Sequence, residues 1–296
     1  MKIKARAKIN WALDVVGKRD DGYHLLDTLM QSVELYDTVE FFRSDTIELV
    51  AEVGARVPRD DSNLAIRTAL LLRDMFKVEQ GVTIKLTKRI PIGAGLGGGS
   101  ADAAAVLVGL NRLWKLGLSD DELQAVGLRI GADVPFCICG GLARATGVGE
   151  VLERLPVPKL CYLVIVQPCR GLSTKEVFSL FDGEKARRAD ITAALDAVSS
   201  GEFFRMTSAL TNALQPTAVI LRPEIAYAIQ ALEHAGALTA QMSGSGSAVF
   251  GVFTSAHSAQ KAWELMKPIW ERSFTTRIAS RGLVPREWQG QQGQSP

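Results

Sequence analysis

Apolar and polar positions along the first half of the chain follow two different periods. Residues 82–88 place three aliphatic side chains on one face and threonine or lysine on the other, which predicts a half-buried strand. Residues 4–19, 32–44 and 46–54 carry β-branched and aromatic side chains and predict three more strands. The DDGYH sequence at 20–24 has the composition of a turn.

Helical spacing appears between these strands and after them. Residues 62–76 and 100–116 have apolar side chains three and four positions apart, which predicts two helices. Gly117 stands where a helix C-cap belongs. Ser119 and Glu122 have the spacing of a capping box and predict the start of a third helix.

The second half predicts a similar mixture of elements. Residues 161–168 read as a buried strand, and residues 238–253 as a strand, a turn of small residues and another strand. Further helices are predicted at 173–181, 190–198, 223–234 and 258–269. Antiparallel strand signals mixed with helices favour an α+β fold in two domains.

Two prolines in residues 152–159 indicate a joint between these domains. We therefore expect an N-terminal domain at 1–155 and a C-terminal domain at 156–283. Residues 284–296 have little to bury, and they are expected to be a disordered tail.

The composition is that of a globular protein and argues against several other classes. With 296 residues, 47% hydrophobic and 22% charged, the chain can bury a sizeable core, and a net charge of +2 with no basic stripe argues against nucleic acid as a partner. No apolar run is long enough for a membrane span, and the start of the chain does not resemble a signal peptide. Four cysteines without a CxxC pair predict neither zinc nor a disulfide framework. Reduced thiols in a cytoplasmic protein are the expectation.

The sequence PIGAGLGGGSADAA, from Pro91 to Ala104, follows one predicted strand and leads into a predicted helix. A helix N-terminus offers unpaired N–H groups and the positive end of a dipole. Glycine removes Cβ and permits positive φ, so such amides can converge on phosphate oxygens. The loop therefore predicts a phosphate cradle, with Ser100 adding a hydroxyl at the helix start.

Other interpretations of this loop fit less well. It matches GxGxxG, and Asp120 lies about twenty residues later, but no second strand precedes that acid and the preceding strand alternates. No lysine precedes Ser100, so the Walker A pattern is absent. A tightly turned loop with no ligand remains the structural alternative.

Phosphoryl transfer also needs charge neutralisation, usually by Mg²⁺, and a group that positions or deprotonates the acceptor hydroxyl. Asp133 lies in GADVPF, beside an apolar stretch, and Lys8 lies within an apolar strand. Taken singly, such a residue is more often a helix cap or a charged residue at the edge of a strand. A lysine and an aspartate in apolar surroundings could also pair with each other.

Several motifs together resemble known proteins. PIGAGLGGGSADAA resembles the signature loop of the GHMP kinases, and MSGSGSAVFGVF resembles their third motif. AKINWALDVVGKRDDGYHLLDTLM and LGLRIGADVPF resemble the branch of that superfamily that acts on 4-diphosphocytidyl-2-C-methyl-D-erythritol. The resemblance extends from about Ala7 to Phe253. It implies a two-domain GHMP kinase fold with the active site in the cleft between the domains.

The resemblance implies transfer of the ATP γ-phosphate to the 2-hydroxyl of that small molecule, in the non-mevalonate isoprenoid pathway. It places the catalytic lysine at Lys8 and the catalytic aspartate at Asp133. Asp133 would accept the hydroxyl proton, and Lys8 would orient that hydroxyl. Mg²⁺ would accompany ATP, with Ser100 approaching the ion.

Ligand-binding residues follow from the same motifs. The residues implied for ATP are Asn63, Pro91, Ile92, Gly93, Ala94, Gly95, Leu96, Gly97, Gly98, Gly99, Ser100 and Ala101. The residues implied for the substrate are Asn10, Tyr23, His24, Phe178, Gly244 and Gly246. Three of these residues also have a purely structural interpretation. Tyr23 could pack in the core, His24 could be a turn residue, and Phe178 is as readily a core residue.

Two other functions remain open at this point. One is a GHMP kinase for a different small alcohol, against which DGYH argues. The other is a catalytically silent ligand-binding relative, against which the presence of Lys8, Asp133 and the complete loop argues. No membrane or nucleic-acid partner is expected, and the chain is expected to be a monomer or a weak homodimer.

Overall fold

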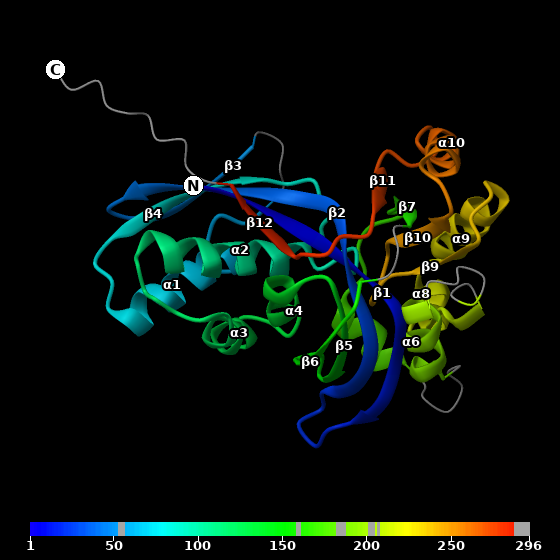
Figure 1. The fold of residues 1–296 in the computed structure, drawn as a ribbon, viewed down its shortest axis with the longest axis horizontal. Coiled ribbons are helices and arrows are strands. Elements are labelled where there is room, and N and C mark those ends of the chain that lie inside the picture. The colour runs from blue at the N-terminus through cyan, green and yellow to red at the C-terminus, as the bar shows by residue number, and fades with distance from the viewer. Residues whose placement is uncertain (53–56, 158–160, 182–187, 201–204, 206–207, 287–296) are drawn as a thin grey trace.

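The computed structural model describes residues 1–296 except 53–56, 158–160, 182–187, 201–204, 206–207 and 287–296. Two β-sheets and the helices that cover them make up this described part (Figure 1). Strands and helices are mixed along the chain, as the α+β prediction requires.

The larger sheet contains eight strands within the described residues and has a long hairpin at its centre. Its strands are β1 (Lys2–Lys18), β2 (His24–Ser44), β3 (Ile47–Ala51), β4 (Gly81–Thr87), β5 (Leu142–Gly147), β6 (Val151–Leu155), β8 (Thr211–Asn212) and β12 (Leu283–Arg286). The antiparallel pair β1 and β2 is the hairpin, and the predicted DDGYH turn connects it. One half of β2 pairs with β4 and the other half with β5, so this strand links two parts of the sheet.

The alternation predicted for residues 82–88 is confirmed in β4. Val82, Ile84 and Leu86 are fully buried, whereas Lys85 between them is exposed. Their side chains join the main core together with helices α1 (Leu64–Phe76) and α2 (Gly98–Leu113), which lie along one face of the sheet (Figure 1).

The C-terminal end of the chain returns to the first strand. In β12, Leu283 to Arg286 pair antiparallel with Lys2 to Ala5 of β1. Residues 284–286 therefore belong to a strand and not to the predicted tail, because they continue a ladder on the open edge of β1. The rest of that predicted tail, 287–296, lies outside the described residues.

The smaller sheet is covered on both faces. Its order is β11 (Ser273–Arg277), β7 (Tyr162–Val166), β10 (Val249–Phe253) and β9 (Thr239–Met242). Within β7, Leu163 and Ile165 join the core of the larger sheet, whereas Val164 and Val166 join a second core. This two-sided burial explains the continuous apolar run and confirms the predicted buried strand.

The remaining helices are α3 (Asp120–Leu128), α4 (Val134–Cys139), α5 (Thr174–Leu180), α6 (Ile191–Ser200), α8 (Gln215–Leu221), α9 (Glu224–His234) and α10 (Ala256–Met266). The predicted capping box of Ser119 and Glu122 is confirmed at the start of α3. None of the helices in the described ranges has the length and apolar character that crossing a membrane requires.

Some element boundaries differ from the predictions. Helix α2 ends at Leu113, three residues before the predicted end, and the Asn111 side chain hydrogen-bonds both N–H and C=O of Leu118 to shape the exit. Strand β6 occupies much of the predicted joint at 152–159, because residues 151–155 pair with β5. The short helices α4 and α8 give too few turns to produce a clear period in the sequence.

Candidate active site

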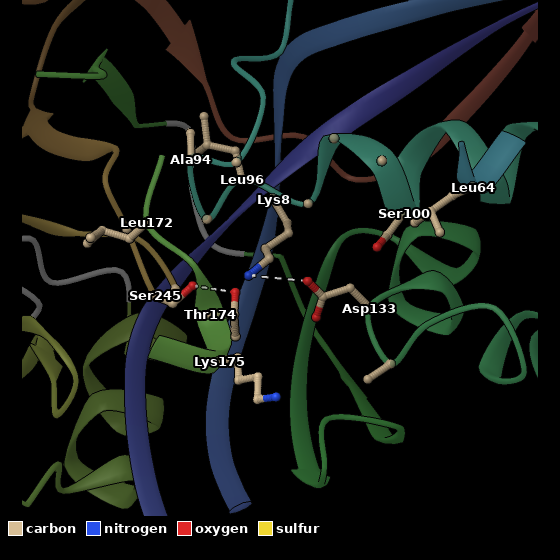
Figure 2. Close-up of a pocket in the computed structure, with 18 of the residues that line it drawn as sticks. Lys8, Leu64, Ala94, Leu96, Ser100, Asp133, Leu172, Thr174, Lys175 and Ser245 are labelled. Carbon is tan, nitrogen blue, oxygen red and sulfur yellow. Dashed lines mark hydrogen bonds and ion pairs between the residues drawn. The ribbon is translucent and has the colours of Figure 1, made fainter. Parts of the chain in front are cut away.

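A cavity of about 1160 Å³ opens where the glycine loop, the β1–β2 hairpin and the turns of the smaller sheet meet (Figure 2). Residues that are far apart in the sequence converge on its wall. The predicted site residues that line it are Lys8, Asn10, Tyr23, His24, Asn63, Pro91, Ile92, Gly93, Ala94, Gly95, Leu96, Gly97, Gly98, Gly99, Ser100, Asp133, Phe178, Gly244 and Gly246.

Ala101 is the exception among the predicted residues. It is fully buried, and its N–H donates to the Gly97 carbonyl at 2.8 Å, so it faces the core from within helix α2. Ala101 is therefore not among the residues that line the cavity, and its contact with ATP stays a prediction. The first helical turn already satisfies its backbone donor.

Lys8 and Asp133 lie on the same side of the cavity and face each other (Figure 2). The Lys8 Nζ atom is 3.6 Å from Asp133 Oδ2 and donates a hydrogen bond of 2.8 Å to Asn10 Oδ1. Asn10 Nδ2 donates in turn to Thr28 Oγ1 at 2.8 Å. Only 5% of Lys8 is exposed, so these partners hold its ammonium group in one place.

The start of helix α4 directs Asp133 toward the cavity. Asp133 occupies the N-cap position with helical backbone angles, and its side chain makes no capping hydrogen bond. Pro135 lies in the first turn and fixes the backbone there. Proline is tolerated at this place, because the N–H groups of a first turn have no partner within the helix. The Asp133 carboxylate, 32% exposed, is thus left available to Lys8 and to a ligand.

The glycine loop packs too closely for side chains at several positions, among them Gly95 and Gly97. A Cβ on Gly95, whose φ is +76°, would lie 2.1 Å from the Ser243 carbonyl oxygen. A Cβ on Gly97, whose φ is +68°, would lie 2.9 Å from Cγ of Lys8. These glycines let the loop lie directly against both Lys8 and the turn that begins at Ser243.

Helix α2 begins immediately after this loop and points its N-terminus at the cavity. Gly98, Gly99 and Ser100 form its first turn and all line the cavity. The Ser100 hydroxyl points toward the side that holds Asp133 (Figure 2). Unpaired N–H groups of a helix's first turn can bind an anion such as phosphate, and here they line the same cavity as the Lys8–Asp133 pair.

The turn at residues 243–246 packs against the glycine loop, and its residues 244–246 also line the cavity. Asn212 Nδ2 donates to the carbonyl oxygens of Met242 and Gly244, each at 2.8 Å, and so fixes the turn. The Ser245 hydroxyl is 2.9 Å from that of Thr174 (Figure 2). Sequence reasoning missed Asn212 and Thr174, because neither belongs to a motif.

Tyr23, His24 and Phe178 line the cavity and form an aromatic patch. Tyr23 is 64% exposed, so it does not pack in the core. The His24 ring stacks on the Phe178 ring, with centroids 4.9 Å apart and planes 24° from parallel. Burial, with the positive charge of Lys18 second, lowers the pKa of His24, so its ring is neutral near pH 7.

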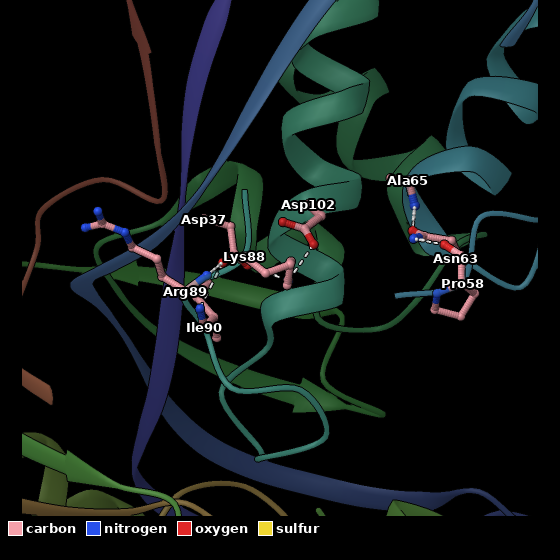
Figure 3. Close-up of polar contacts among 8 residues, drawn as sticks. All are labelled: Asp37, Pro58, Asn63, Ala65, Lys88, Arg89, Ile90 and Asp102. Atoms are coloured by element: carbon pink, nitrogen blue, oxygen red, sulfur yellow. Dashed lines mark hydrogen bonds and ion pairs between the residues drawn. The ribbon is translucent and has the colours of Figure 1, made fainter. Parts of the chain in front are cut away.

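Asn63 has a structural role that the sequence did not indicate. It caps helix α1, with Oδ1 accepting from the Ala65 N–H at 3.0 Å and Nδ2 donating to the Pro58 carbonyl at 2.8 Å (Figure 3). Its amide is therefore engaged by the chain itself. Contact between Asn63 and adenine stays a prediction.

Among the described residues, no group of three or more histidine, cysteine or acidic side chains could hold a metal ion. Mg²⁺ in phosphoryl-transfer sites is commonly held by one or two protein oxygens together with substrate phosphates and water. Ser100 and Asp133 supply such oxygens beside the phosphate site. The residues present therefore fit an ion that arrives with its nucleotide.

Comparison with known proteins places the chain in a family. The model of the GHMP kinases N terminal domain matches residues 63–141, and that of the GHMP kinases C terminal matches residues 184–267. A 4-diphosphocytidyl-2-C-methyl-D-erythritol kinase of Thermoanaerobacter pseudethanolicus is 39% identical over 96% of this chain and 98% of the relative. One of Bacillus velezensis is 40% identical over 93% of this chain and 96% of the relative.

Solved structures agree with these matches. A crystal structure of 4-(cytidine 5'-diphospho)-2C-methyl-D-erythritol kinase is 34% identical, with a TM-score of 0.80 over 94% of this chain and 99% of that one. A homoserine kinase of Cytophaga hutchinsonii shares the fold, with 23% identity and a TM-score of 0.77 over 96% of each chain. The chain therefore has the GHMP kinase fold and belongs to the 4-diphosphocytidyl-2-C-methyl-D-erythritol kinase family.

Proposed function

We propose that this chain transfers the γ-phosphate of ATP to the 2-hydroxyl of 4-diphosphocytidyl-2-C-methyl-D-erythritol. The products are ADP and the corresponding 2-phosphate, an intermediate of the non-mevalonate route to isoprenoid precursors. Family membership supports the substrate and the reaction. The observation that carries the proposal is the Lys8–Asp133 pair facing the first turn of helix α2 across one cavity.

Asp133 accepts the proton of the acceptor hydroxyl as its oxygen attacks the γ-phosphate. A carboxylate serves as this base when it lies within hydrogen-bond reach of the hydroxyl. Lys8 donates to the acceptor oxygen and holds Asp133 in position, since its ammonium group is anchored by Asn10. Most of the rate enhancement then comes from placing the hydroxyl in line with the phosphate.

The loop from Pro91 to Ser100 binds the ATP phosphates through the backbone N–H groups at the start of α2. Ser100 and the phosphates would hold Mg²⁺, which would offset the negative charge of the transferring group. Gly244 and Gly246 let the turn at residues 243–246 approach the same phosphates. These donors are fixed by the fold before ATP arrives, so little reorganisation is needed during the reaction.

The aromatic patch binds the cytidine end of the substrate. Tyr23 offers an exposed ring face, and Phe178 is stacked on His24 beside it. A pyrimidine can stack on these rings while the His24 ring hydrogen-bonds its edge. Asn10 contacts the methylerythritol unit, because it lies next to the Lys8 ammonium group.

We also propose that the protein works in the cytoplasm as a monomer or a weak homodimer. All four cysteines are free thiols, which is typical of a reducing compartment. Light scattering after gel filtration measures the mass in solution. A stable tetramer or higher assembly would contradict this part of the proposal.

The test of the proposed reaction is an acceptor panel. ADP release from MgATP is followed with 4-diphosphocytidyl-2-C-methyl-D-erythritol, galactose, homoserine and mevalonate, and the product phosphate is located by NMR. Turnover with the cytidine compound alone, with phosphate on its 2-oxygen, supports the proposal. Turnover with one of the other alcohols, and none with the cytidine compound, would contradict it.

A further inference from the structure

Three charged side chains from separate elements form a buried cluster beside the first turns of helix α2 (Figure 3). Asp37 comes from β2, Lys88 follows the end of β4, and Asp102 lies in the second turn of α2. The Lys88 Nζ atom donates to Asp37 Oδ2 at 2.5 Å and to Asp102 Oδ2 at 2.6 Å. Asp37 is completely buried and Asp102 is 3% exposed.

Asp37 lies where the ladder between β2 and β4 ends. The last paired residues are Thr38 and Thr87, and the chain then leaves the sheet to enter the loop. Asp37 Oδ1 accepts hydrogen bonds from the N–H groups of Arg89 at 2.5 Å and Ile90 at 2.8 Å. This carboxylate therefore takes the place of a strand carbonyl and fixes the entry to the loop.

The other end of the loop is fixed by the same cluster. A Cβ on Gly98, the first residue of α2, would lie 3.4 Å from Lys88 Nζ and 2.9 Å from Cγ2 of Ile90. Lys88 therefore packs directly beneath the start of the helix, and its bond to Asp102 joins it to the next turn. One ammonium group connects both ends of the loop.

The charge of Lys88 is balanced within the cluster. Burial opposes that charge, but the adjacent carboxylates of Asp102 and Asp37 outweigh burial and raise the pKa of Lys88. Lys88 and Asp102 also line the cavity, but both carboxylates lie at hydrogen-bond distance from the ammonium group and hold it within the cluster. This arrangement differs from a P-loop, in which the lysine itself reaches the phosphates.

We propose that Asp37, Lys88 and Asp102 form a clamp that holds the entry and exit of the phosphate-binding loop in register, and that Lys88 is a positioning residue that does not contact phosphate. The proposal rests on the proposed role of this loop in binding ATP. The clamp pre-organises the N–H groups of α2, so nucleotide binding does not have to order residues 91–97, which include three glycines.

A charge-matched pair of variants tests the clamp. Lys88→Gln leaves two buried carboxylates without a cation, whereas Lys88→Gln combined with Asp102→Asn restores the single net negative charge that the parent cluster has when both carboxylates are ionised. Burial raises the pKa of Asp102 to about 7, so the comparison is made at a pH above that value. MgADP affinity is measured by titration calorimetry, which needs no acceptor. We expect the single variant to bind about 10- to 100-fold more weakly, and the double variant to recover most of the loss.

Lys85→Gln is the matched control, since it removes an exposed lysine three residues earlier, within β4. It should bind MgADP as the parent does. The KM for ATP should rise in Lys88→Gln while the KM for the acceptor stays unchanged. A general loss of structure would raise both.

Two results would overturn the clamp: parent-like affinity in Lys88→Gln, or a double variant that binds as weakly as the single one, which would show that the lysine charge itself acts on phosphate. If the single variant does not fold, hydrogen exchange on the parent decides. Slow exchange of the Arg89 and Ile90 amides in the nucleotide-free protein supports the clamp, and fast exchange refutes it. Neither measurement depends on which alcohol is phosphorylated, so a wrong acceptor leaves the test intact.

Discussion

At the scale of single residues, the proposed chemistry depends on polar side chains buried in an otherwise apolar strand. Lys8 and Asn10 alternate in β1 with Ile9 and Trp11, which are fully buried. An unpaired ammonium group in such surroundings would be very unfavourable. The contacts to Asn10 and Asp133 remove that penalty and also fix the group where an acceptor hydroxyl can meet it.

Tyr23→Ala tests the aromatic patch. Stacking on an aromatic ring contributes about 1–3 kcal/mol per base, so we expect the KM for the cytidine substrate to rise about 5- to 140-fold. The KM for ATP should not change, because the glycine loop is unaltered. Steady-state kinetics with each substrate varied in turn provides the measurement.

Phe42→Ala is the matched control for that variant, since Phe42 is another exposed aromatic residue of the same hairpin and does not line the cavity. Its kinetics should equal those of the parent. Equal acceptor KM values in Tyr23→Ala and the parent would remove Tyr23 from the binding site.

The buried cysteines predict how stability changes at alkaline pH. Burial raises the pKa of Cys161 to about 12, whereas the ordinary value is 9.0. The folded protein keeps this proton while the unfolded chain loses it, so stability falls as the pH rises above 9. Compared with Cys161→Ala, the parent should lose about 1 kcal/mol of unfolding free energy between about pH 9 and pH 10.

Urea unfolding of both proteins across that pH range gives the comparison. The variant has a lower stability at every pH because it leaves a small cavity, and only the change of the difference with pH is informative. A difference that stays constant would show that the Cys161 thiol ionises as readily in the folded protein as in the unfolded one.

At the scale of elements, the conformation of the glycine loop depends on close contacts with Lys8 and with the turn that begins at Ser243. Gly95→Ala would place a methyl group 2.1 Å from the Ser243 carbonyl in a backbone conformation with positive φ. We expect a loss of about 1–3 kcal/mol of stability and a raised KM for ATP, because the loop must move away from the facing turn.

Gly22→Ala separates these two causes. Gly22 also has a positive φ, +89°, but a Cβ there would meet nothing within 4 Å. This variant should show the conformational penalty without the clash and without any change in the KM for ATP. If the two variants lose the same stability and keep the KM of the parent for ATP, the contact between the loop and the Ser243 turn does not affect ATP binding.

Elements with a strong local signal were predictable from the sequence. The alternation of β4 and the capping box of α3 each depend on neighbouring residues alone, and both are confirmed. Strand β6 was not predictable, because none of its residues is buried and its place is set by pairing with β5. The early end of α2 likewise depends on a side chain, Asn111, that gives no periodic signal.

The candidate site was predictable only in part for the same reason. Motifs identified Lys8, Asp133 and the glycine loop, but their convergence on one cavity depends on tertiary structure. Lys88 was missed, because a lysine at the end of an alternating strand ordinarily faces solvent. Its partner Asp37 lies 51 residues earlier, so no local pattern links the two.

At the scale of the whole molecule, the two halves of the chain share one core. Trp11 of β1 packs edge-on against Phe250 of β10, with ring centroids 5.6 Å apart. Strands β8 and β12, both from the second half, pair with β1. The predicted domain boundary at residue 155 therefore separates residues that bury one another.

A fragment of residues 1–155 should accordingly fail to fold alone. It would expose the Trp11 side of β1, and it would leave β1 without its partners β8 and β12. We expect aggregation, or no cooperative transition by circular dichroism. A chain ending at Arg286 keeps every described element and should unfold cooperatively. A fragment that is monomeric and cooperative would support independent domains instead.

The most direct test of the central claim compares the parent with Asp133→Asn and Lys8→Met in a coupled ADP-release assay with MgATP and 4-diphosphocytidyl-2-C-methyl-D-erythritol. We predict turnover by the parent and a fall in kcat of about 10²- to 10⁴-fold in each variant, with MgADP affinity unchanged. Turnover by folded Asp133→Asn at the rate of the parent would contradict the assignment of Asp133 as the base.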